Sequence, residues 1–166
     1  MQTFMPCENF DLTAQVLDDK RLNKQALEAW QIMMTNLKLD PNGEFREPRG
    51  WVNHPAAVMW RGYEQALLAY IEAMVQEWVV NRHYKSTIFD KALNTFTVAV
   101  EHDLTEYTDE LILPEWMLNE IQFDKVQKTH RIALLAKNYG WYSQFRWPED
   151  NGFQPPAAYE YYWPNN

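Results

Sequence analysis

Three clusters of polar and aromatic residues have the types and spacing needed to bind, or to act on, a planar charged ligand. The first lies between Asp18 and Glu28. In a helix its basic, amide and acidic side chains recur at i, i+3, i+4 and i+7 on one face: Arg21, Lys24, Gln25 and Glu28. Such a face can hold a phosphate through charge-assisted hydrogen bonds and read a base edge. The same spacing also suits a solvated face held by an Arg21–Gln25 or a Lys24–Glu28 pair.

The second cluster, Gly50 to Tyr63, combines aromatic rings with an amide, an imidazole and a guanidinium. His54 precedes Pro55, a residue typical of the first helical turn, where backbone amides attract anions. Asn53 can read a base edge, and the tryptophans can stack on a base. The alternative is that Asn53 or His54 only caps the helix while the tryptophans pack in the core. The candidate ligand-binding residues here are Trp51, Asn53, His54, Trp60, Arg61 and Tyr63.

The third cluster is Lys128-Thr129-His130-Arg131, in which His130 and Arg131 are candidate ligand-binding residues. An isolated His-Arg pair on a helix is more often a surface feature or a satisfied part of the core. The chain has no nucleophilic triad, phosphate-binding glycine loop or dinucleotide-binding glycine turn. Its four histidines and lone cysteine lack metal-ligand spacing, so we expect neither a metal site nor a cofactor.

The charge of the chain bears on its partners. With 166 residues, we expect a single domain over residues 1–166, and the formal net charge of −8 opposes unassisted binding to a polyanion. A local basic patch remains open, and its candidates are Lys20, Arg21, Lys24, Arg46 and Arg49. Acidic residues concentrate between positions 101 and 120, which we interpret as a solvated face.

The composition also indicates a location. No apolar run approaches the roughly 20 residues that span a bilayer. The start of the chain lacks the basic and apolar regions of a signal peptide, so none is expected. The lone Cys7 suits a reducing compartment. Together these features predict a cytoplasmic protein.

Apolar spacing and capping residues predict the elements of the first half. A helix is expected from Asp11, as its N-cap, to about Leu37, with a break near Asp18. Pro55 opens a second helix, whose apolar stripe continues to about Asn81 and should be core. Proline and glycine between positions 41 and 50 indicate a loop.

The second half is less regular. In residues 84–110, Ser86 could cap a helix, but β-branched residues weaken that prediction. A turn at 114–119 and a helix over 121–138 follow, with Gly140 as the C-cap. The aromatic and proline-rich tail should wrap the helices and cover either core or a ligand pocket. The expected fold is an all-α, compact, irregular helical bundle.

In chain order these segments resemble the pyrimidine-dimer DNA glycosylase family, the endonuclease V type found in phages, and more closely a bacterial and phage branch of it. The resemblance covers most of the chain except residues 84–110, which we interpret as an insertion. The segments that carry it are Met1–Phe4, Leu17–Gln25, Gly50–Tyr63, Lys128–Arg131 with Leu134 and Leu135, and the endings at Trp141-Tyr142 and Trp163-Pro164.

The resemblance implies a compact all-α fold whose amino terminus threads between helices into the active site. Characterised members of the family attack the deoxyribose carbon with the free α-amine exposed after removal of the initiator methionine. An imine forms, a glutamate on the first long helix assists, and base flipping gives access to the duplex. An α-amine has a pKa near 8 in general, so part of it is neutral and nucleophilic at pH 7.

Two positions depart from the family pattern. Gln2 is too large for ordinary methionine removal, so the amine would belong to Met1 rather than to Gln2. The helix position of the family glutamate is predicted to hold Gln25. An amide can neither take a proton as a carboxylate does nor stabilise an oxocarbenium ion by charge. Glu28, one turn later, or Asp18 could substitute, away from the matching position.

These departures favour a non-catalytic protein that binds a nucleotide or base, such as a phage protein that sequesters a small nucleotide signal. The alternatives are an active DNA glycosylase and AP lyase that excises damaged pyrimidines, an enzyme that cleaves a small nucleotide, or a structural module. The expected partner is a nucleotide or nucleic acid and not a membrane, and a homo-oligomer remains open. In the binding hypothesis the phosphate contacts are Arg21, Lys24, Arg61 and Arg131, and the stacking residues are Trp51, Trp60 or a tail tyrosine.

Overall fold

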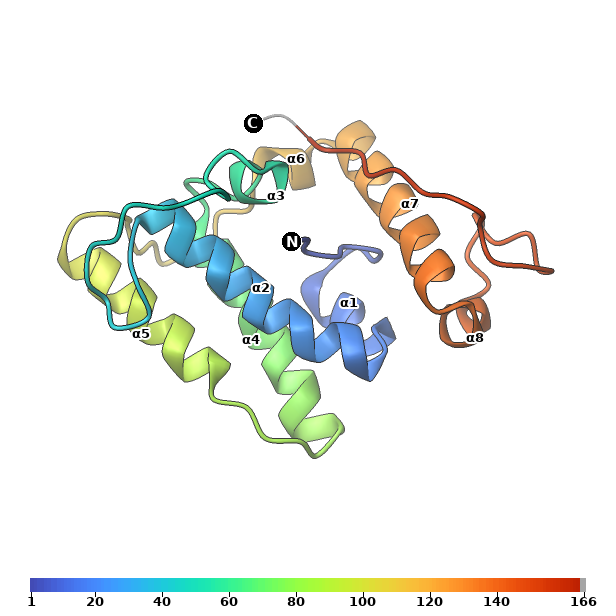
Figure 1. Ribbon diagram of the computed structural model, residues 1–166, viewed down its shortest axis with the longest axis horizontal. Coiled ribbons are helices and arrows are strands. Elements are labelled where there is room, and N and C mark those ends of the chain that lie inside the picture. Colours follow the sequence, from blue (N-terminus) through green and yellow to red (C-terminus); the bar gives the residue numbers. More distant parts are fainter. Residues whose placement is uncertain (165–166) are drawn as a thin grey trace.

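The computed structural model describes residues 1–164, and their regular structure is helical apart from one isolated bridge between Leu39 and Phe45. The prediction of an all-α fold is confirmed. The helices are α1 (Phe10–Val16), α2 (Asp19–Leu37), α3 (Pro55–Val58), α4 (Glu64–Gln76), η1 (Glu77–Asn81, π-helical), α5 (Ile88–Glu101), α6 (Glu115–Leu118), α7 (Glu120–Lys137), α8 (Tyr139–Tyr142) and η2 (Ser143–Phe145, 3-10) (Figure 1).

The core is built where α2, α4 and α5 pack against one another. The apolar stripe predicted to begin near Pro55 supplies much of it, because Leu67, Tyr70 and Ile71 are fully buried. Helix α7 lies apart from these three helices, and the amino-terminal segment runs between α2 and α7 (Figure 1). Residues 2–6 of that segment are buried, and Met1 before them is half-buried.

The predicted break near Asp18 is confirmed, since α1 ends two residues before it and α2 begins directly after it. The Asp18 side chain makes no capping hydrogen bond and instead accepts from Arg21, Asn138 and Tyr142. Burial alone would raise the pKa of Asp18, but these hydrogen bonds hold it below its ordinary value. Asp18 therefore ties the start of α2 to the end of α7 and to α8.

The prediction that Asp11 caps the first helix is wrong. The N-cap is Asn9, whose side-chain oxygen accepts the backbone N–H of Leu12 at 2.8 Å. Asn and Asp are almost equally good in this position, so spacing alone did not separate them.

The single helix predicted between Pro55 and Asn81 is also wrong, although both ends are correctly placed. Helix α3 lasts only four residues, and α4 begins at Glu64. Gly62 lies between them with a φ of +85°, a left-handed conformation that cannot continue a right-handed helix. The chain therefore turns a corner before the core helix begins.

Residues 84–110 contain α5, which packs on α2 and α4. Its β-branched residues do not prevent the helix, because one of them is used in the core: Trp30 donates from Nε1 to Thr95 Oγ1 at 2.9 Å. The N-cap is Thr87 rather than the predicted Ser86, whose hydroxyl accepts the N–H of Ile88 at 3.2 Å. The interpretation of this region as an insertion stays a prediction.

In the last third, the predicted turn and long helix correspond to α6 and α7. The predicted C-cap is wrong, because Asn138 ends α7 and Gly140 lies inside α8. The tail returns along α7 (Figure 1), and Tyr161, Tyr162 and Trp163 pack against the core. The acidic residues between positions 101 and 120 are exposed, as expected for a solvated face. They are Glu101, Asp103, Glu106, Asp109, Glu110, Glu115 and Glu120. No helix within residues 1–164 has both the length and the apolar character to cross a bilayer.

Candidate functional site

Two clefts meet at the amino terminus, and Met1 and Glu28 line both of them. One cleft has a volume of about 450 Å³, and the other has a volume of about 410 Å³. We call the first the lysine cleft, and its cationic and phenolic lining residues are Lys20, Arg21, Lys24, Lys137, Tyr159 and Tyr161. We call the second the arginine cleft, which is lined by Arg46, Arg49 and Trp51 with apolar residues Met34, Leu39, Pro41 and Pro48.

Hydrogen bonds from three helices fix the buried amino-terminal segment. The N–H of Phe4 donates to Gln25 Oε1 at 2.7 Å, and the N–H of Met5 donates to His130 Nδ1 at 2.8 Å. The Tyr70 hydroxyl lies 2.8 Å from Gln25 Oε1 and 2.9 Å from the carbonyl oxygen of Phe4. Since burial raises the pKa of Tyr70 well above its usual value, its hydroxyl stays protonated. Buried hydrogen bonds therefore join the amino-terminal segment to α2, α4 and α7.

Trp60 anchors the same segment, because its Nε1–H donates to Thr3 Oγ1 at 2.8 Å and its side chain is fully buried. The prediction that Trp60 stacks on a ligand is therefore wrong. Its ring packs against Tyr70, Trp116 and Phe10.

The carboxylate beside the amino terminus belongs to Glu28. Its Oε2 accepts the backbone N–H of Gln2 at 3.1 Å, and its Oε1 lies 3.5 Å from Lys24 Nζ. Gln25 is only 2% exposed and bonds Phe4, two residues further into the protein. Glu28, one helical turn after Gln25, is therefore the residue of this helix that lies beside the amino terminus, and Gln25 anchors the segment at Phe4. The prediction that Gln25 stands in the place of the family's glutamate has to be corrected accordingly.

His54 lies on the other side of the amino terminus. It is the N-cap of α3, and its Nδ1 accepts the N–H of Ala56 at 3.1 Å, so a neutral ring carries its proton on Nε2. Partial burial lowers the pKa of His54, and the positive charge of the amino terminus lowers it further. Its ring centroid is 4.9 Å from that of Trp51 and 5.7 Å from that of Trp163. The predicted capping role of His54 is confirmed, and its role as a ligand contact stays a prediction.

Trp51 is the aromatic residue of the second cluster whose ring is exposed enough to contact a ligand. It is 44% exposed and lines the arginine cleft. Asn53 is exposed and is not among the residues that line either cleft, and half-buried Tyr63 serves as the N-cap of α4.

His130 is buried in the core and does not reach either cleft. Burial lowers its pKa to about 3, so it is neutral and accepts the Met5 N–H through Nδ1. Its ring packs edge-on against Phe4 and Tyr161. The prediction of His130 as a ligand contact is wrong, because His130 is a buried core residue. Its Nδ1 is bonded, whereas its Nε2 has no hydrogen-bond partner among residues 1–164.

Two arginines predicted to bind phosphate are used within the fold. Arg131 forms a two-pronged ion pair with Glu149 at 2.7 and 2.8 Å and donates to the carbonyl of Pro6 at 3.1 Å. Arg61 donates to the Val52 carbonyl and to the side chain of Asn36. Neither arginine lines the clefts, so both predictions have to be corrected.

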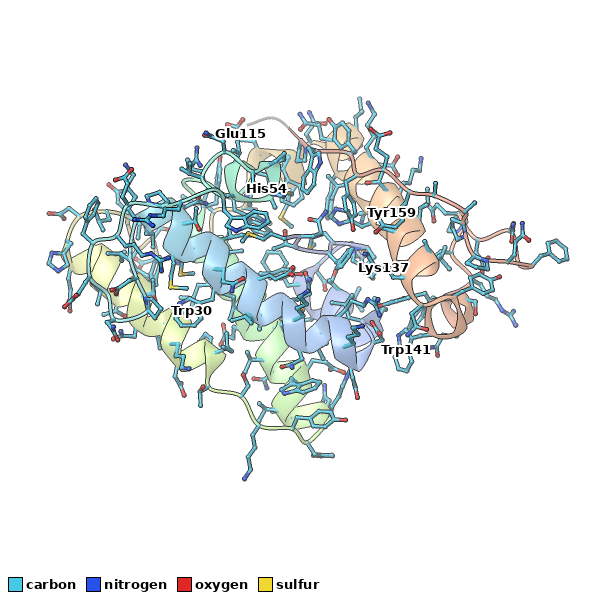
Figure 2. The ribbon with its side chains drawn as sticks, viewed as in Figure 1. Trp30, His54, Glu115, Lys137, Trp141 and Tyr159 are labelled. Carbon is cyan, nitrogen blue, oxygen red and sulfur yellow. The ribbon has the colours of Figure 1, made fainter. Side chains whose placement is uncertain are left out.

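In the lysine cleft, reasoning from the sequence missed Lys137 and named Tyr159 and Tyr161 only as members of the tyrosine-rich tail. Lys137 Nζ lies 2.9 Å from the hydroxyl of Tyr159 and 5.0 Å from the centroid of its ring (Figure 2). The hydrogen bond from Lys137 lowers the pKa of Tyr159. Tyr161 lies beside them and contacts Phe4. The sequence predicted that the aromatic tail covers either core or a ligand pocket and that a tail tyrosine could stack on a base, but it did not single out Tyr159 or Tyr161.

One of three comparisons with known proteins identifies a family for this chain. The family model of pyrimidine dimer DNA glycosylase matches residues 1–92, which include the amino-terminal segment, Glu28 and all of the residues that line the arginine cleft. No curated protein and no solved structure matched the chain. Because the matched residues make up more than half of the 166-residue chain, the protein belongs to the pyrimidine dimer DNA glycosylase family.

Proposed function

We propose that the protein is a DNA glycosylase and lyase in which the α-amine of Met1 is the nucleophile and Glu28 is the assisting carboxylate. The observation that carries this proposal is the hydrogen bond of 3.1 Å between the Gln2 N–H and Glu28 Oε2. It holds a carboxylate within one residue of the amine, where the lysine and arginine clefts meet.

The chemistry uses both groups. The neutral amine attacks C1′ of a deoxyribose, the bond from C1′ to the base breaks, and the base leaves with the electron pair. The Glu28 carboxylate stabilises the positive charge that develops on the sugar and accepts the proton that the amine loses. The C1′–O4′ bond of this adduct then breaks, O4′ takes a proton, and the opened sugar is an imine of the amine. At an abasic site the amine condenses with the aldehyde to the same imine, and one water is released. Proton removal from C2′ of the imine then expels the 3′ phosphate.

Phosphates of the substrate would be held by the cationic side chains that surround this junction. They come from the start of α2, the loop before α3 and the end of α7: Lys20, Arg21, Lys24, Arg46, Arg49 and Lys137. The net charge of −8 opposes DNA binding only if charge is spread evenly. Here the cations gather around the amine, which gives a local site for a polyanion.

The proposal assigns the amine to Met1 because Gln2, the next residue, is too large for ordinary methionine removal. The backbone nitrogen of Gln2 is the group bonded to Glu28, and the Gln2 side chain is buried with its Oε1 accepting the N–H of Thr3 at 2.8 Å. Met1 is the half-buried residue that reaches both clefts. The intact mass of the purified protein will show whether Met1 is present.

A second candidate is a protein that binds a small nucleotide without cleaving it. Clefts of about 450 and 410 Å³ fall within the usual size of small-molecule sites. The exposed ring of Trp51 beside Arg46 and Arg49 offers a stacking surface next to phosphate-binding groups.

Strand cleavage separates the two candidates. Untagged protein is incubated with duplexes that carry one abasic site or one ultraviolet-induced pyrimidine dimer, beside protein acetylated at its amino terminus. The proposal predicts cleavage by the free protein and none by the acetylated one, since acetylation removes the nucleophile. Absence of cleavage by either, together with saturable binding of a nucleoside monophosphate, favours the second candidate.

A further inference from the structure

A long apolar groove lies along α4, away from the amino terminus. It consists of two adjoining hollows of about 480 and 490 Å³, which share Ala69, Glu72 and Leu111 and share no residue with the lysine or arginine cleft. We call it the α4 groove. Its floor is a stripe of α4 at helical spacing, from Gln65 to Gln76, which corresponds to about 16 Å of helix.

One wall of the α4 groove is a parallel stripe of α5 that includes Phe89, Leu93 and Val100. The other side is closed by the segment after α5. Leu93 is 42% exposed, and Tyr107 and Leu111 are 63% and 44% exposed, so the groove presents large apolar side chains to solvent. The stripe of α5 walls the hollow over Gln65 to Glu72, and the second hollow continues the floor to Gln76. An elongated apolar groove of this kind has the shape that receives the apolar face of an amphipathic helix.

The charge of the groove limits what can fill it. Four carboxylates line it, and none of them forms an ion pair within residues 1–164; they are Glu8, Asp11, Glu72 and Glu101. No lysine or arginine is among the lining residues. Exposed Glu106, Asp109 and Glu110 add to the negative charge in the same stretch of chain. This surface repels a nucleic acid, an anionic membrane and a second copy of itself.

We propose that the α4 groove docks a basic amphipathic helix of a partner protein. The apolar face of that helix fills the groove over about three turns, and its lysines and arginines meet the unpaired carboxylates. The α4 groove shares no lining residue with the two clefts at the amino terminus.

The test uses a labelled synthetic helix with leucines on one face and lysines on the other, titrated into the full-length protein and followed by fluorescence anisotropy. A scrambled peptide of the same composition is the control for charge alone. We expect saturable binding of the amphipathic peptide, about tenfold or more weaker binding of the scrambled one, and loss of affinity as salt rises. Equal binding of both peptides would overturn the proposal.

Variants locate the binding on the protein. Leu93→Glu and the double variant Glu72→Lys with Glu101→Lys change exposed side chains of the groove, and each should weaken binding about tenfold or more. Leu118→Glu and Glu120→Lys are the matched controls, because both residues are exposed and lie outside the groove. Binding that the groove variants leave unchanged would refute this site. A concentration-dependent dimer that Leu93→Glu abolishes would assign the groove to a second copy instead.

Discussion

The clefts at the amino terminus and the α4 groove have opposite charge, although α2 and α4, which carry them, pack directly against each other. Six lysines and arginines line the two clefts, whereas four carboxylates and no basic residue line the groove. A net charge of −8 therefore describes neither surface. The distribution of charge over a small domain, and not its net charge, therefore decides which surface can bind a polyanion.

The two surfaces also differ in how firmly they are built. The clefts surround a chain segment fixed by Gln25, Tyr70, Trp60 and His130 through buried hydrogen bonds. The groove leaves the apolar side chains of Leu93, Tyr107 and Leu111 substantially exposed to solvent. Rigid placement is what a nucleophile needs, and an open apolar stripe is typical of a docking surface.

Replacing Glu28 should have the largest effect on the clefts. Glu28→Gln keeps the size of the side chain but removes the charge, and we expect the rate of strand cleavage to fall about 10²- to 10⁴-fold, the usual contribution of an acid–base group. Single-turnover kinetics on an abasic duplex will measure it. Gln31→Ala is the control, since Gln31 is exposed on the same helix and lines the arginine cleft. Equal losses in both variants would contradict a specific role for Glu28.

Two tryptophans of one segment should behave in opposite ways. Trp60→Ala removes a fully buried ring and should lower the free energy of unfolding by about 3–5 kcal/mol. Trp51→Ala removes an exposed ring at the arginine cleft and should weaken nucleotide or DNA binding by about 1–3 kcal/mol while leaving stability nearly unchanged. Urea denaturation and equilibrium binding will separate the two effects. A large loss of stability in Trp51→Ala would mean that this ring serves packing and not ligand binding.

Arginines should divide in the same way. Arg131→Ala breaks a largely buried ion pair with Glu149 and should cost about 3 kcal/mol of stability. Arg46→Ala should leave stability unchanged and lower the slope of log affinity for DNA against log salt by about 0.9, the value for one phosphate contact. Salt titrations of DNA binding will check this. An unchanged slope in Arg46→Ala would remove the arginine cleft from the DNA-binding surface.

A further expected effect, seen only at acidic pH, concerns the anchoring of the amino-terminal segment. His130 has a pKa of about 3 in the folded protein, well below its ordinary value of about 6.5, because it is buried. Between these values the unfolded chain binds one more proton, so the free energy of unfolding falls as pH drops, by up to about 1.4 kcal/mol per pH unit. His130→Gln cannot titrate and should show a shallower decline in urea denaturation between about pH 6 and pH 4. Equal slopes in the two proteins would contradict this account of His130.

The sequence predicted the elements better than the contacts between them. Helical spacing correctly placed Gln25 and Glu28 on one face of α2, where both line the lysine cleft. It could not tell which of the two reaches the amino terminus, because that depends on how deeply residues 1–6 thread between α2 and α7. The sequence did not show that the helix breaks at Gly62, because the break depends on the positive φ that this glycine adopts in the folded chain.

Partners distant in sequence account for the remaining corrections. Arg131 and Glu149 are 18 positions apart and Trp60 and Thr3 are 57 apart, so no local pattern reveals that these side chains are occupied. Lys137 and Tyr159 meet because the tail reverses along α7 (Figure 1). A lone arginine, histidine or tryptophan looks the same in a sequence whether it packs or binds, and only tertiary structure separates the two.

The most direct test of the central claim is borohydride trapping of the untagged protein on a duplex with an abasic site, followed by peptide mapping of the adduct. The account predicts a covalent protein–DNA adduct whose modified residue is Met1, strongly reduced in Glu28→Gln and unchanged in Leu93→Glu. An adduct mapped to Lys137 or to another lysine would show that the amine at the junction of the two clefts is not the nucleophile. No adduct at all, beside a family glycosylase that traps normally, would contradict the proposed chemistry outright.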